Sequence, residues 1–344
     1  MKILIVKTSS LGDIIHAFPA LAYLRDTFPG VQIDWAVEEP FSEILEAHPY
    51  VDNVIAIQTR IWRKALWCRE TWREVGRCIK KMRRNCYDIV FDLQGNTKSG
   101  IITLLSGGKS RVGFALKDVA EWPNVFSTNR RYALVEKQNI RDDYLSVIKK
   151  YFCDDVPFDD DKIVLDITTE QHHALRKYSS GDYNVMVCPG SAWKNKRVTE
   201  ECLSDFLSMI TVEYRPYFIF IWGNDVERVF VERLHRKFLG NSVVAEKLSL
   251  PILQNLMGMV QLVVAMDSLA LHLCATTTTP TFSVFGASES DKYKPPGAEH
   301  YALQGTCPYG KTFIKRCPQL RTCQTGGCIR NITGRTMYES WRNQ

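Results

Sequence analysis

Short apolar segments alternate with segments of helical period along the first half of the chain. Four apolar segments have the length and β-branched content of buried strands, at residues 2–6, 32–36, 54–57 and 89–92. Three segments carry apolar residues at helical spacing, at residues 18–27, 62–84 and 97–105. Segment 118–139 is less regular. Strands that alternate with helices in this way are typical of a parallel sheet in an α/β fold.

The second half of the chain shows a similar alternation. Its candidate buried strands lie at residues 184–188, 217–222, 262–265 and 281–285. The acidic segment 154–161, which contains Pro157, predicts a linker between two domains, 1–160 and 161–344. Because 344 residues exceed the size of one hydrophobic core, two doubly wound domains are the simplest organisation. Such domains bind ligands beyond the carboxyl ends of their strands, so the loops there are the candidate sites.

The first of these loops joins a strand to a helix through small hydroxylated residues and an acid. The apolar period changes between Thr8 and Gly12, which predicts that Asp13 lies in the first helical turn. Gly12 lets a ligand approach the backbone, and the N–H groups of the turn favour an anionic or electron-rich group. The alternative is that Ser9, Ser10 and Asp13 only cap the helix. Spacing alone favours the cap.

The composition is that of an ordinary globular protein, with 45% hydrophobic and 24% charged residues. No stretch approaches the roughly 20 apolar residues that span a bilayer. The first residues lack the apolar length of a signal peptide, so we expect a cytoplasmic protein. No Gly-x-Gly-x-x-Gly follows the first strand, which argues against a Rossmann dehydrogenase.

Positive charge is concentrated between Arg60 and Arg84. This segment contains ten Lys or Arg residues against Glu70 and Glu74, so it carries +8 while the whole chain carries +6. A solvated helix face is one interpretation. A local excess of this size more often meets an anionic partner, such as the phosphates of nucleic acid, of a membrane surface or of a glycolipid.

The chain has eleven cysteines, and reduced thiols are expected because they are spread over a long chain without an export signal. Cys188, Cys202 and Cys274 lie in apolar segments and are predicted core residues. Four more cysteines stand close together near the end of the chain, at positions 307, 317, 323 and 328. Their spacing lacks the tight pairs of common zinc sites, which favours structural thiols over a bound metal.

Six motifs follow the predicted strands in a fixed order. They are Lys7-Thr8-Ser9-Ser10-Leu11-Gly12-Asp13, Asp92-Leu93-Gln94-Gly95-Asn96-Thr97-Lys98-Ser99, Cys188-Pro189-Gly190-Ser191 with Lys196-Arg197, Trp222-Gly223 with Glu227, Asp267-Ser268 with His272, and Thr281-Phe282-Ser283-Val284-Phe285-Gly286. Together they resemble the loops of glycosyltransferase family 9, the heptosyltransferases of the lipopolysaccharide core. The resemblance extends from Met1 to about residue 300.

The resemblance implies the GT-B fold, in which two Rossmann-like domains face each other across a cleft. Residues 1–160 would form the acceptor-binding domain, and residues 161–344 the nucleotide-sugar-binding domain with its cysteine-containing tail. The implied reaction is an inverting, metal-independent transfer of heptose from ADP-L-glycero-D-manno-heptose to Kdo of the lipopolysaccharide inner core. Alternatives are another sugar or core acceptor, and a non-catalytic anion-binding protein on the same scaffold.

The resemblance also implies where the protein works and with which partners. The acceptor would be Kdo-lipid A, an anionic glycolipid, and nucleic acid would not be a partner. The basic segment would bind this acceptor at the cytoplasmic face of the inner membrane, where the protein would be peripheral. No cofactor is implied.

Donor binding is assigned by the resemblance to eight residues: Gly190, Ser191, Lys196, Glu227, Leu248, Asp267, Ser268 and His272. Helix N-termini expected after Ser191 and Asp267 would offer N–H groups to the pyrophosphate, and Lys196 a full charge. Glu227 would accept hydrogen bonds from the nucleoside sugar. His272 either contacts the donor phosphate or packs as a core histidine.

Asp13 is the implied general base, which would deprotonate the acceptor hydroxyl as it attacks the anomeric carbon. Acceptor binding is assigned to Ser9, Ser10, Gly12, Arg60, Arg63, Lys64, Gln94 and Lys98. The chain departs from the family pattern at Leu269, where the family has glycine. Val198 and Thr199 also stand where the family usually has Trp-Pro. These differences bear on the sugar transferred more than on the fold.

Overall fold

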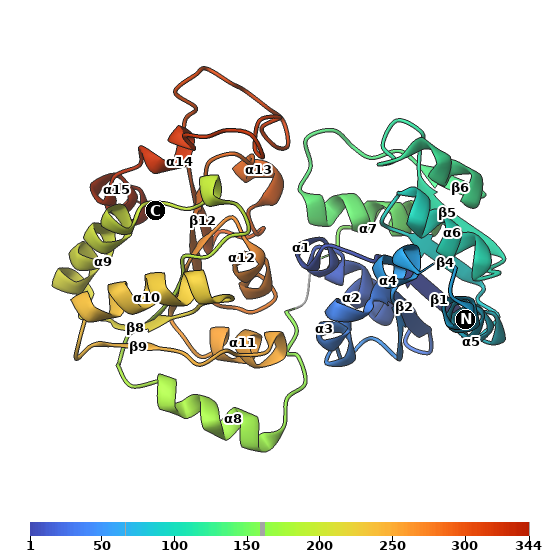
Figure 1. Ribbon diagram of the computed structural model, residues 1–344, viewed down its shortest axis with the longest axis horizontal. Coiled ribbons are helices and arrows are strands. Elements are labelled where there is room, and N and C mark those ends of the chain that lie inside the picture. Colours follow the sequence, from blue (N-terminus) through green and yellow to red (C-terminus); the bar gives the residue numbers. More distant parts are fainter. Residues whose placement is uncertain (66, 159–161, 344) are drawn as a thin grey trace. The chain divides into compact units, whose positions relative to one another are not determined.

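The computed structural model describes residues 1–65, 67–158 and 162–343, which form two compact units, Met1–Asp161 and Lys162–Gln344 (Figure 1). The domain boundary predicted between residues 160 and 161 lies outside the described residues. Each unit contains one six-stranded parallel sheet. Within the described ranges, no helix has the length and apolar content needed to cross a membrane.

The sheet of the first unit is built on a completely buried centre. Its strands are β1 (Lys2–Val6), β2 (Gln32–Glu38), β3 (Asn53–Ile57), β4 (Ile89–Asp92), β5 (Ser110–Phe114) and β6 (Arg130–Tyr132). They are ordered β3-β2-β1-β4-β5-β6. In the centre Ile5 pairs with Trp35 on one side and with Phe91 on the other, and all three are fully buried. Burial on both faces explains why these strands have continuous apolar sequences.

The helices of the first unit follow its strands in alternation. They are α1 (Leu11–Ile15), α2 (Phe18–Thr27), α3 (Ser42–Glu46), α4 (Thr59–Lys64), α5 (Arg69–Arg84), α6 (Thr97–Leu105) and α7 (Ile140–Tyr151), with 3-10 helices η1 (Glu39–Phe41) and η2 (Trp122–Ser127). Met82 of α5 and Ile102 of α6 pack on the sheet in one hydrophobic cluster. The single helix predicted over residues 62–84 is wrong, because Ala65 and Cys68 have non-helical backbone angles and separate α4 from α5.

The second unit repeats this architecture with the same order of strands across its sheet. Its strands are β7 (Asn184–Cys188), β8 (Tyr217–Phe220), β9 (Ser242–Val244), β10 (Leu262–Met266), β11 (Thr281–Phe285) and β12 (His300–Gln304). They are ordered β12-β11-β10-β7-β8-β9. The central strands β7 and β10 are completely buried. Cys188, Cys202 and Cys274 are buried in this unit, which confirms their prediction as core residues.

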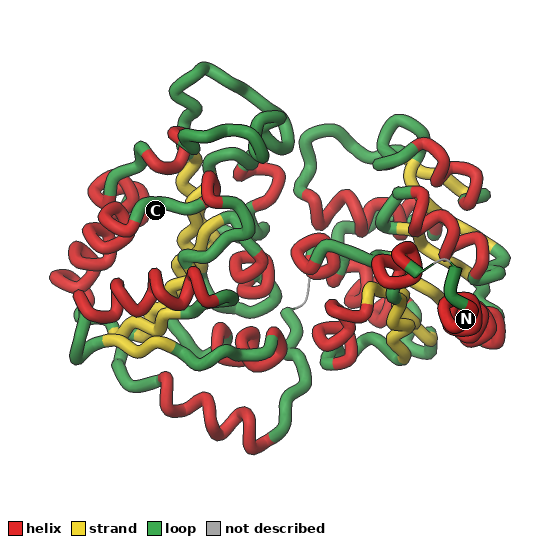
Figure 2. The backbone as a smooth tube through the Cα atoms, viewed as in Figure 1, coloured by secondary structure: helices red, strands yellow, loops and turns green. Residues whose placement is uncertain are grey.

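Helices cover both faces of the second sheet. They are α8 (Thr169–Leu175), α9 (Glu200–Tyr214), α10 (Asp225–Lys237), α11 (Leu250–Met257), α12 (Leu269–Cys274), α13 (Ser290–Tyr293), α14 (Gly327–Arg330) and α15 (Gly334–Arg342), with 3-10 helices η3 (Arg176–Tyr178) and η4 (Lys194–Lys196). Figure 1 shows α9, α10 and α15 on one side of the sheet and α11 and α12 on the other. Between β12 and α14 the chain forms a long loop, drawn green in Figure 2.

The strand order reverses once in each sheet, between β1 and β4 in the first and between β7 and β10 in the second. Two crossovers leave in opposite directions at such a point, so the loops after the two strands open a crevice that binds ligands in doubly wound folds. Topology therefore selects four loops, which follow Val6, Asp92, Cys188 and Met266.

Candidate active site

The two loops at the reversal point of the second unit meet through Asp267. Lys196 Nζ lies 2.5 Å from Asp267 Oδ2, and both side chains are less than a tenth exposed. The Ser191 hydroxyl donates to the Asp267 carbonyl oxygen at 3.3 Å. Removing only one partner of such a buried ion pair strongly destabilises the folded protein, because the other charge stays buried without compensation. Lys196 is thus a buried charge with a fixed position, not an ordinary surface lysine.

Asp267 stays ionised despite its burial. Burial acts to raise its pKa, but the charges of Lys196 and His272 and the hydrogen bond from Lys196 hold the pKa of this carboxyl below its usual range. His272 Nε2 lies 3.8 Å from Asp267 Oδ1. His272 is therefore buried and also contacts the acid, so both interpretations of this residue agree with the structure.

Glu227 and Arg197 extend this cluster toward the loop after β8. The Gly223 N–H donates to Glu227 Oε2 at 2.9 Å, and Arg197 Nη2 lies 3.3 Å from Glu227 Oε1. Arg197 Nε also donates to the Ser191 carbonyl oxygen at 2.7 Å. A Cβ atom at Gly190 would lie 2.5 Å from the Glu227 carboxylate, so this close approach requires glycine. The cluster therefore presents one lysine, one arginine and two acids.

The structure brings together six of the eight predicted donor residues: Gly190, Ser191, Lys196, Glu227, Asp267 and His272. Ser268 follows Asp267, and its buried hydroxyl has no hydrogen-bond partner in the described part of the chain. Leu248 lies between β9, the edge strand of the sheet, and α11. Arg197 belongs to the motif quoted above but received no role, and only its two contacts reveal one.

One of the two helix N-termini expected here is absent. The segment after Ser191 forms only the three-residue η4, and the next α-helix, α9, begins at Glu200. The Thr199 side chain accepts a hydrogen bond from the Cys202 N–H and caps α9 there. The prediction of a helix N-terminus directly after Ser191 is therefore wrong, whereas α12 does follow Asp267.

In the first unit Gln94 joins the two loops at the reversal point. Its Oε1 accepts hydrogen bonds from the N–H groups of Thr8 and Ser9, both at 3.1 Å. Asp13 lies in the first turn of α1, as predicted. Its Oδ2 accepts hydrogen bonds from the Ser10 N–H at 3.1 Å and the Ser10 hydroxyl at 2.7 Å. These contacts are those of a helix cap, and they also fix the carboxylate at the reversal point.

Two buried charged residues support this loop, and the sequence analysis gave them no role. Lys7 donates to the Tyr144 hydroxyl at 3.0 Å, and burial lowers the Lys7 pKa while the charges of Asp13 and Asp92 oppose the shift. Asp92 Oδ1 accepts hydrogen bonds from the N–H groups of Gln94 and Gly95, each at 3.0 Å. Burial raises the pKa of the Asp92 carboxyl. In the sequence, the only sign of a role is their position: Lys7 directly follows the buried strand β1, and Asp92 is the last residue of the buried strand β4.

The predicted acceptor residues differ in their surroundings. Lys98 Nζ lies 2.8 Å from Oε1 of the buried Glu38. Arg60, Arg63 and Lys64 of α4 are exposed. The acceptor residues thus divide into a loop set at the reversal point and an exposed basic set on α4.

The exposed basic set has aromatic neighbours. Trp67 between α4 and α5 is fully exposed, and Trp72 of α5 is mostly exposed. Exposed tryptophans beside Lys and Arg are typical of surfaces that contact the polar region of a membrane. In the described part of the chain, no three or more His, Cys, Asp or Glu side chains have the mutual spacing of ligands around a bound metal ion.

Comparison with known proteins places this geometry in a family. The model of glycosyltransferase family 9 (heptosyltransferase) matches residues 52–322. Lipopolysaccharide heptosyltransferase 1 of Pseudomonas aeruginosa is 30% identical over 319 residues, which cover 92% of this chain and 87% of that protein. The Escherichia coli K12 protein of the same name is 26% identical over 296 residues, 84% of this chain and 89% of its own.

Solved structures show the same fold. E. coli heptosyltransferase WaaC, solved with ADP-2-deoxy-2-fluoro heptose, is similar with a TM-score of 0.79 at 24% identity, over 100% of this chain and 99% of that one. A family 9 glycosyltransferase from Veillonella parvula has a TM-score of 0.81 at 17% identity, over 99% and 96% of the two chains. The expected fold class, GT-B with two Rossmann-like domains, is confirmed.

Proposed function

Because the chain belongs to glycosyltransferase family 9, we propose that it transfers L-glycero-D-manno-heptose from its ADP-sugar to Kdo of the lipopolysaccharide inner core. The observation that carries this proposal is the match, over 92% of the chain, to a lipopolysaccharide heptosyltransferase 1. The geometry supports it, because the motif residues gather at the reversal points of both sheets. The second unit would bind the donor, and the first unit the acceptor.

The donor site is proposed at the Lys196–Asp267 cluster. A nucleotide diphosphate needs positive charge, and Lys196 and Arg197 stand on the loop after β7 with that charge. Charge-assisted hydrogen bonds from these side chains would stabilise the ADP leaving group as negative charge develops on it. This is the chemistry that a metal ion supplies in other transferases. Glu227 would accept hydrogen bonds from the ribose hydroxyls, and the Ser268 hydroxyl would gain a partner in the donor.

The reaction is proposed as a single inverting displacement. The acceptor hydroxyl oxygen attacks the anomeric carbon, the bond from that carbon to the ADP oxygen breaks, and Asp13 takes the hydroxyl proton. ADP leaves with the electron pair of the broken bond. Ser10 and the first turn of α1 hold the Asp13 carboxylate in place, so its position does not depend on the substrate. General base catalysis by a positioned carboxylate contributes about 10²–10⁴ in rate.

Acceptor recognition is proposed on α4 and the loop after β4. Arg60, Arg63 and Lys64 would bind the carboxylates and phosphates of Kdo-lipid A, and Lys98 would exchange part of its contact with Glu38 for the acceptor. The exposed Trp67 and Trp72 suit the interfacial region of a bilayer. The protein would then work at the cytoplasmic face of the inner membrane as a peripheral enzyme.

The direct test is transfer itself. Purified enzyme is incubated with Kdo-lipid A and a panel of nucleotide sugars, and both ADP release and the mass of the lipid product are measured. We expect one heptose added, from ADP-heptose only. One rival is a different donor sugar. Leu269, the first residue of α12, favours it, because a leucine side chain in place of the family glycine limits how closely a donor can approach the backbone there. Product formed from another nucleotide sugar would support that rival, and no product from any donor would contradict both.

A further inference from the structure

The loop between β12 and α14 is unusually long for a segment without regular structure. It runs from residue 305 to residue 326, and its one strand-like contact is an isolated bridge between Ser288 and Arg316. Loops longer than about 12–15 residues without secondary structure are uncommon in compact domains and usually have a function. The four clustered cysteines lie along this loop and at the start of α14.

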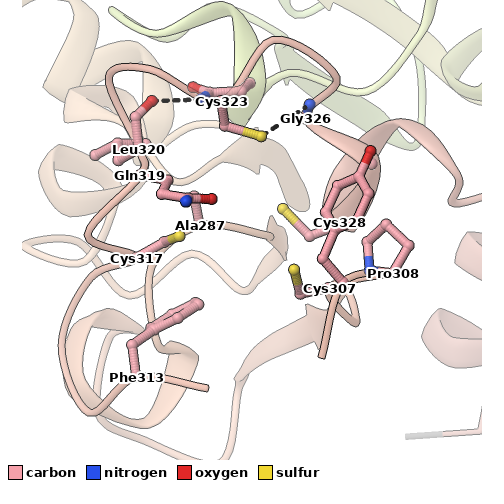
Figure 3. A pocket seen from close by; sticks show the side chains of 13 residues that line it. Ala287, Cys307, Pro308, Phe313, Cys317, Gln319, Leu320, Cys323, Gly326 and Cys328 are labelled. Carbon is pink, nitrogen blue, oxygen red and sulfur yellow. Dashed lines mark hydrogen bonds between the residues drawn. The ribbon is translucent and has the colours of Figure 1, made fainter. Parts of the chain in front are cut away.

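These cysteines come together in space. All four line one small cavity, whose volume is about 20 Å³, enough for one water-sized sphere. Figure 3 shows the sulfur atoms of Cys307, Cys323 and Cys328 pointing into the same space, with Cys317 facing it from the other side.

The surroundings of the cavity suit a soft cation. Its wall contains no charged side chain, and Pro308 and Phe313 contribute apolar surface. The Gly326 N–H donates to Cys323 Sγ at 3.4 Å. Hydrogen bonds from backbone N–H groups to sulfur orient a thiolate ligand and tune its basicity. Gly326 has φ +58°, a left-handed conformation that turns the chain from Cys323 back to Cys328.

We propose that Cys307, Cys317, Cys323 and Cys328 form a tetrathiolate site for a zinc ion. Four thiolates in tetrahedral arrangement are a common structural zinc site, and zinc favours sulfur ligands. In the structure the four sulfur atoms lie farther apart than the ligands of a bound zinc ion. Zinc binding would therefore contract the loop around the cavity. The wide spacing of these cysteines in the sequence favoured thiols without metal, because spacing does not show which distant residues the fold brings together.

The site would act on the donor loop, an effect that rests on the proposed function. The Asn195 side chain donates a hydrogen bond to the Leu320 carbonyl oxygen, and Asn195 is the residue before Lys196. The Arg321 guanidinium lies 5.5 Å from the centre of the Trp193 ring. The cysteine loop thus supports the segment that carries Lys196. A zinc ion that orders this loop would pre-organise the proposed pyrophosphate site.

The test begins with the metal content of the full-length protein, purified under reducing conditions without added metal. We expect one zinc per chain by elemental analysis. Metal-free protein, titrated with zinc against a chromophoric chelator, should bind one ion. Cys323→Ser and Cys317→Ser should each weaken zinc binding at least about tenfold. Cys68→Ser removes an exposed thiol of the other unit and should change nothing. Loss of zinc should also raise the KM for the ADP-sugar more than it lowers kcat.

Three results would overturn the zinc site. The first is metal-free protein with four freely reactive thiols in this loop. The second is an intact mass that reveals disulfides among them, and the third is iron in place of zinc. The zinc content is measured without any turnover, so it is independent of the proposed reaction. A zinc-containing protein that transfers no heptose would contradict the proposed function and leave the site standing.

Discussion

At the scale of single residues, Asp13 is the side chain whose chemistry can be removed with the least change in shape. In Asp13→Asn the amide keeps the size of the carboxylate but cannot take the acceptor proton. We expect kcat to fall about 10²–10⁴-fold, while ADP affinity, measured by calorimetry, stays within about twofold because Asp13 belongs to the other unit. The control is Asp26→Asn, an exposed acid at the end of α2. Near wild-type turnover of Asp13→Asn would exclude Asp13 as the base.

The Lys196–Asp267 pair allows stability and donor binding to be separated. Lys196→Met leaves Asp267 buried without its main counter-charge, which should cost about 3 kcal/mol of unfolding free energy. The double variant Lys196→Met/Asp267→Asn removes both charges and should recover much of that loss. Both variants should bind ADP more weakly than the wild type, since both lack the charge of Lys196 and retain only that of Arg197. Denaturant unfolding and calorimetry measure the two effects.

Lys194→Met is the matched control for this pair, because Lys194 is exposed two residues earlier. It should affect neither stability nor ADP affinity. Strong ADP binding by the double variant would show that Lys196 does not hold the donor.

The same pair predicts how stability changes with pH. The folded pKa of Asp267 is lower than its ordinary value of 3.8, so the folded state favours the ionised form. This contribution is fully present above about pH 4 and is lost as the pH falls from 3.8 through the lower folded pKa. Wild-type protein should therefore lose stability in acid more steeply than Lys196→Met/Asp267→Asn. Denaturant midpoints measured between pH 3 and pH 6 would show equal slopes if the pair were not coupled.

At the scale of elements, α4 should bind anionic surfaces by charge. Arg63→Glu/Lys64→Glu reverses two exposed charges, and each basic residue near an anionic membrane contributes about 1 kcal/mol. We expect binding to liposomes that contain anionic lipid to fall at least about tenfold, and wild-type binding to weaken steeply with salt. Cosedimentation measures both.

Arg236→Glu/Lys237→Glu at the end of α10 makes the same change of charge on the other unit. It should leave liposome binding intact. An equal loss in this control, or wild-type binding that ignores salt, would show that α4 is not the membrane contact.

Most strands that the sequence predicted are buried on both faces, because buried strands have continuous apolar runs; β3, an edge strand with two exposed residues, was also predicted from its apolar run. Strands β5, β6, β9 and β12 were missed. β6, for example, is Arg130-Arg131-Tyr132, an edge strand that is largely exposed. The break between α4 and α5 was missed because basic and apolar residues keep a helical spacing on both sides of it. A hydrophobic pattern reflects which residues are buried, so it does not predict strands or helix ends that are exposed to solvent.

At the scale of the whole molecule, the sequence located the candidate site better than it described its contacts. The motifs identified loops after the predicted strands, among them the four loops that the sheet topology places at the reversal points, since a loop after a buried parallel strand can be recognised from the strand alone. It could not show that Gln94 joins two loops, that Arg197 reaches Glu227, or that four cysteines share a cavity. Those facts depend on contacts between residues far apart in the chain, and only the fold supplies them.

Each unit has its own sheet, core and reversal point, so a ligand that binds one should stabilise that one. ADP at 100 times its Kd should stabilise the unit that binds it by about 2.7 kcal/mol. We expect slower hydrogen exchange in residues 189–199, 223–227 and 267–272, with little change in the opening loop of the first unit. UDP, which has the same diphosphate but another base, is the control and should protect the same loops more weakly. Protection confined to residues 7–16 would reverse the proposed roles of the two units.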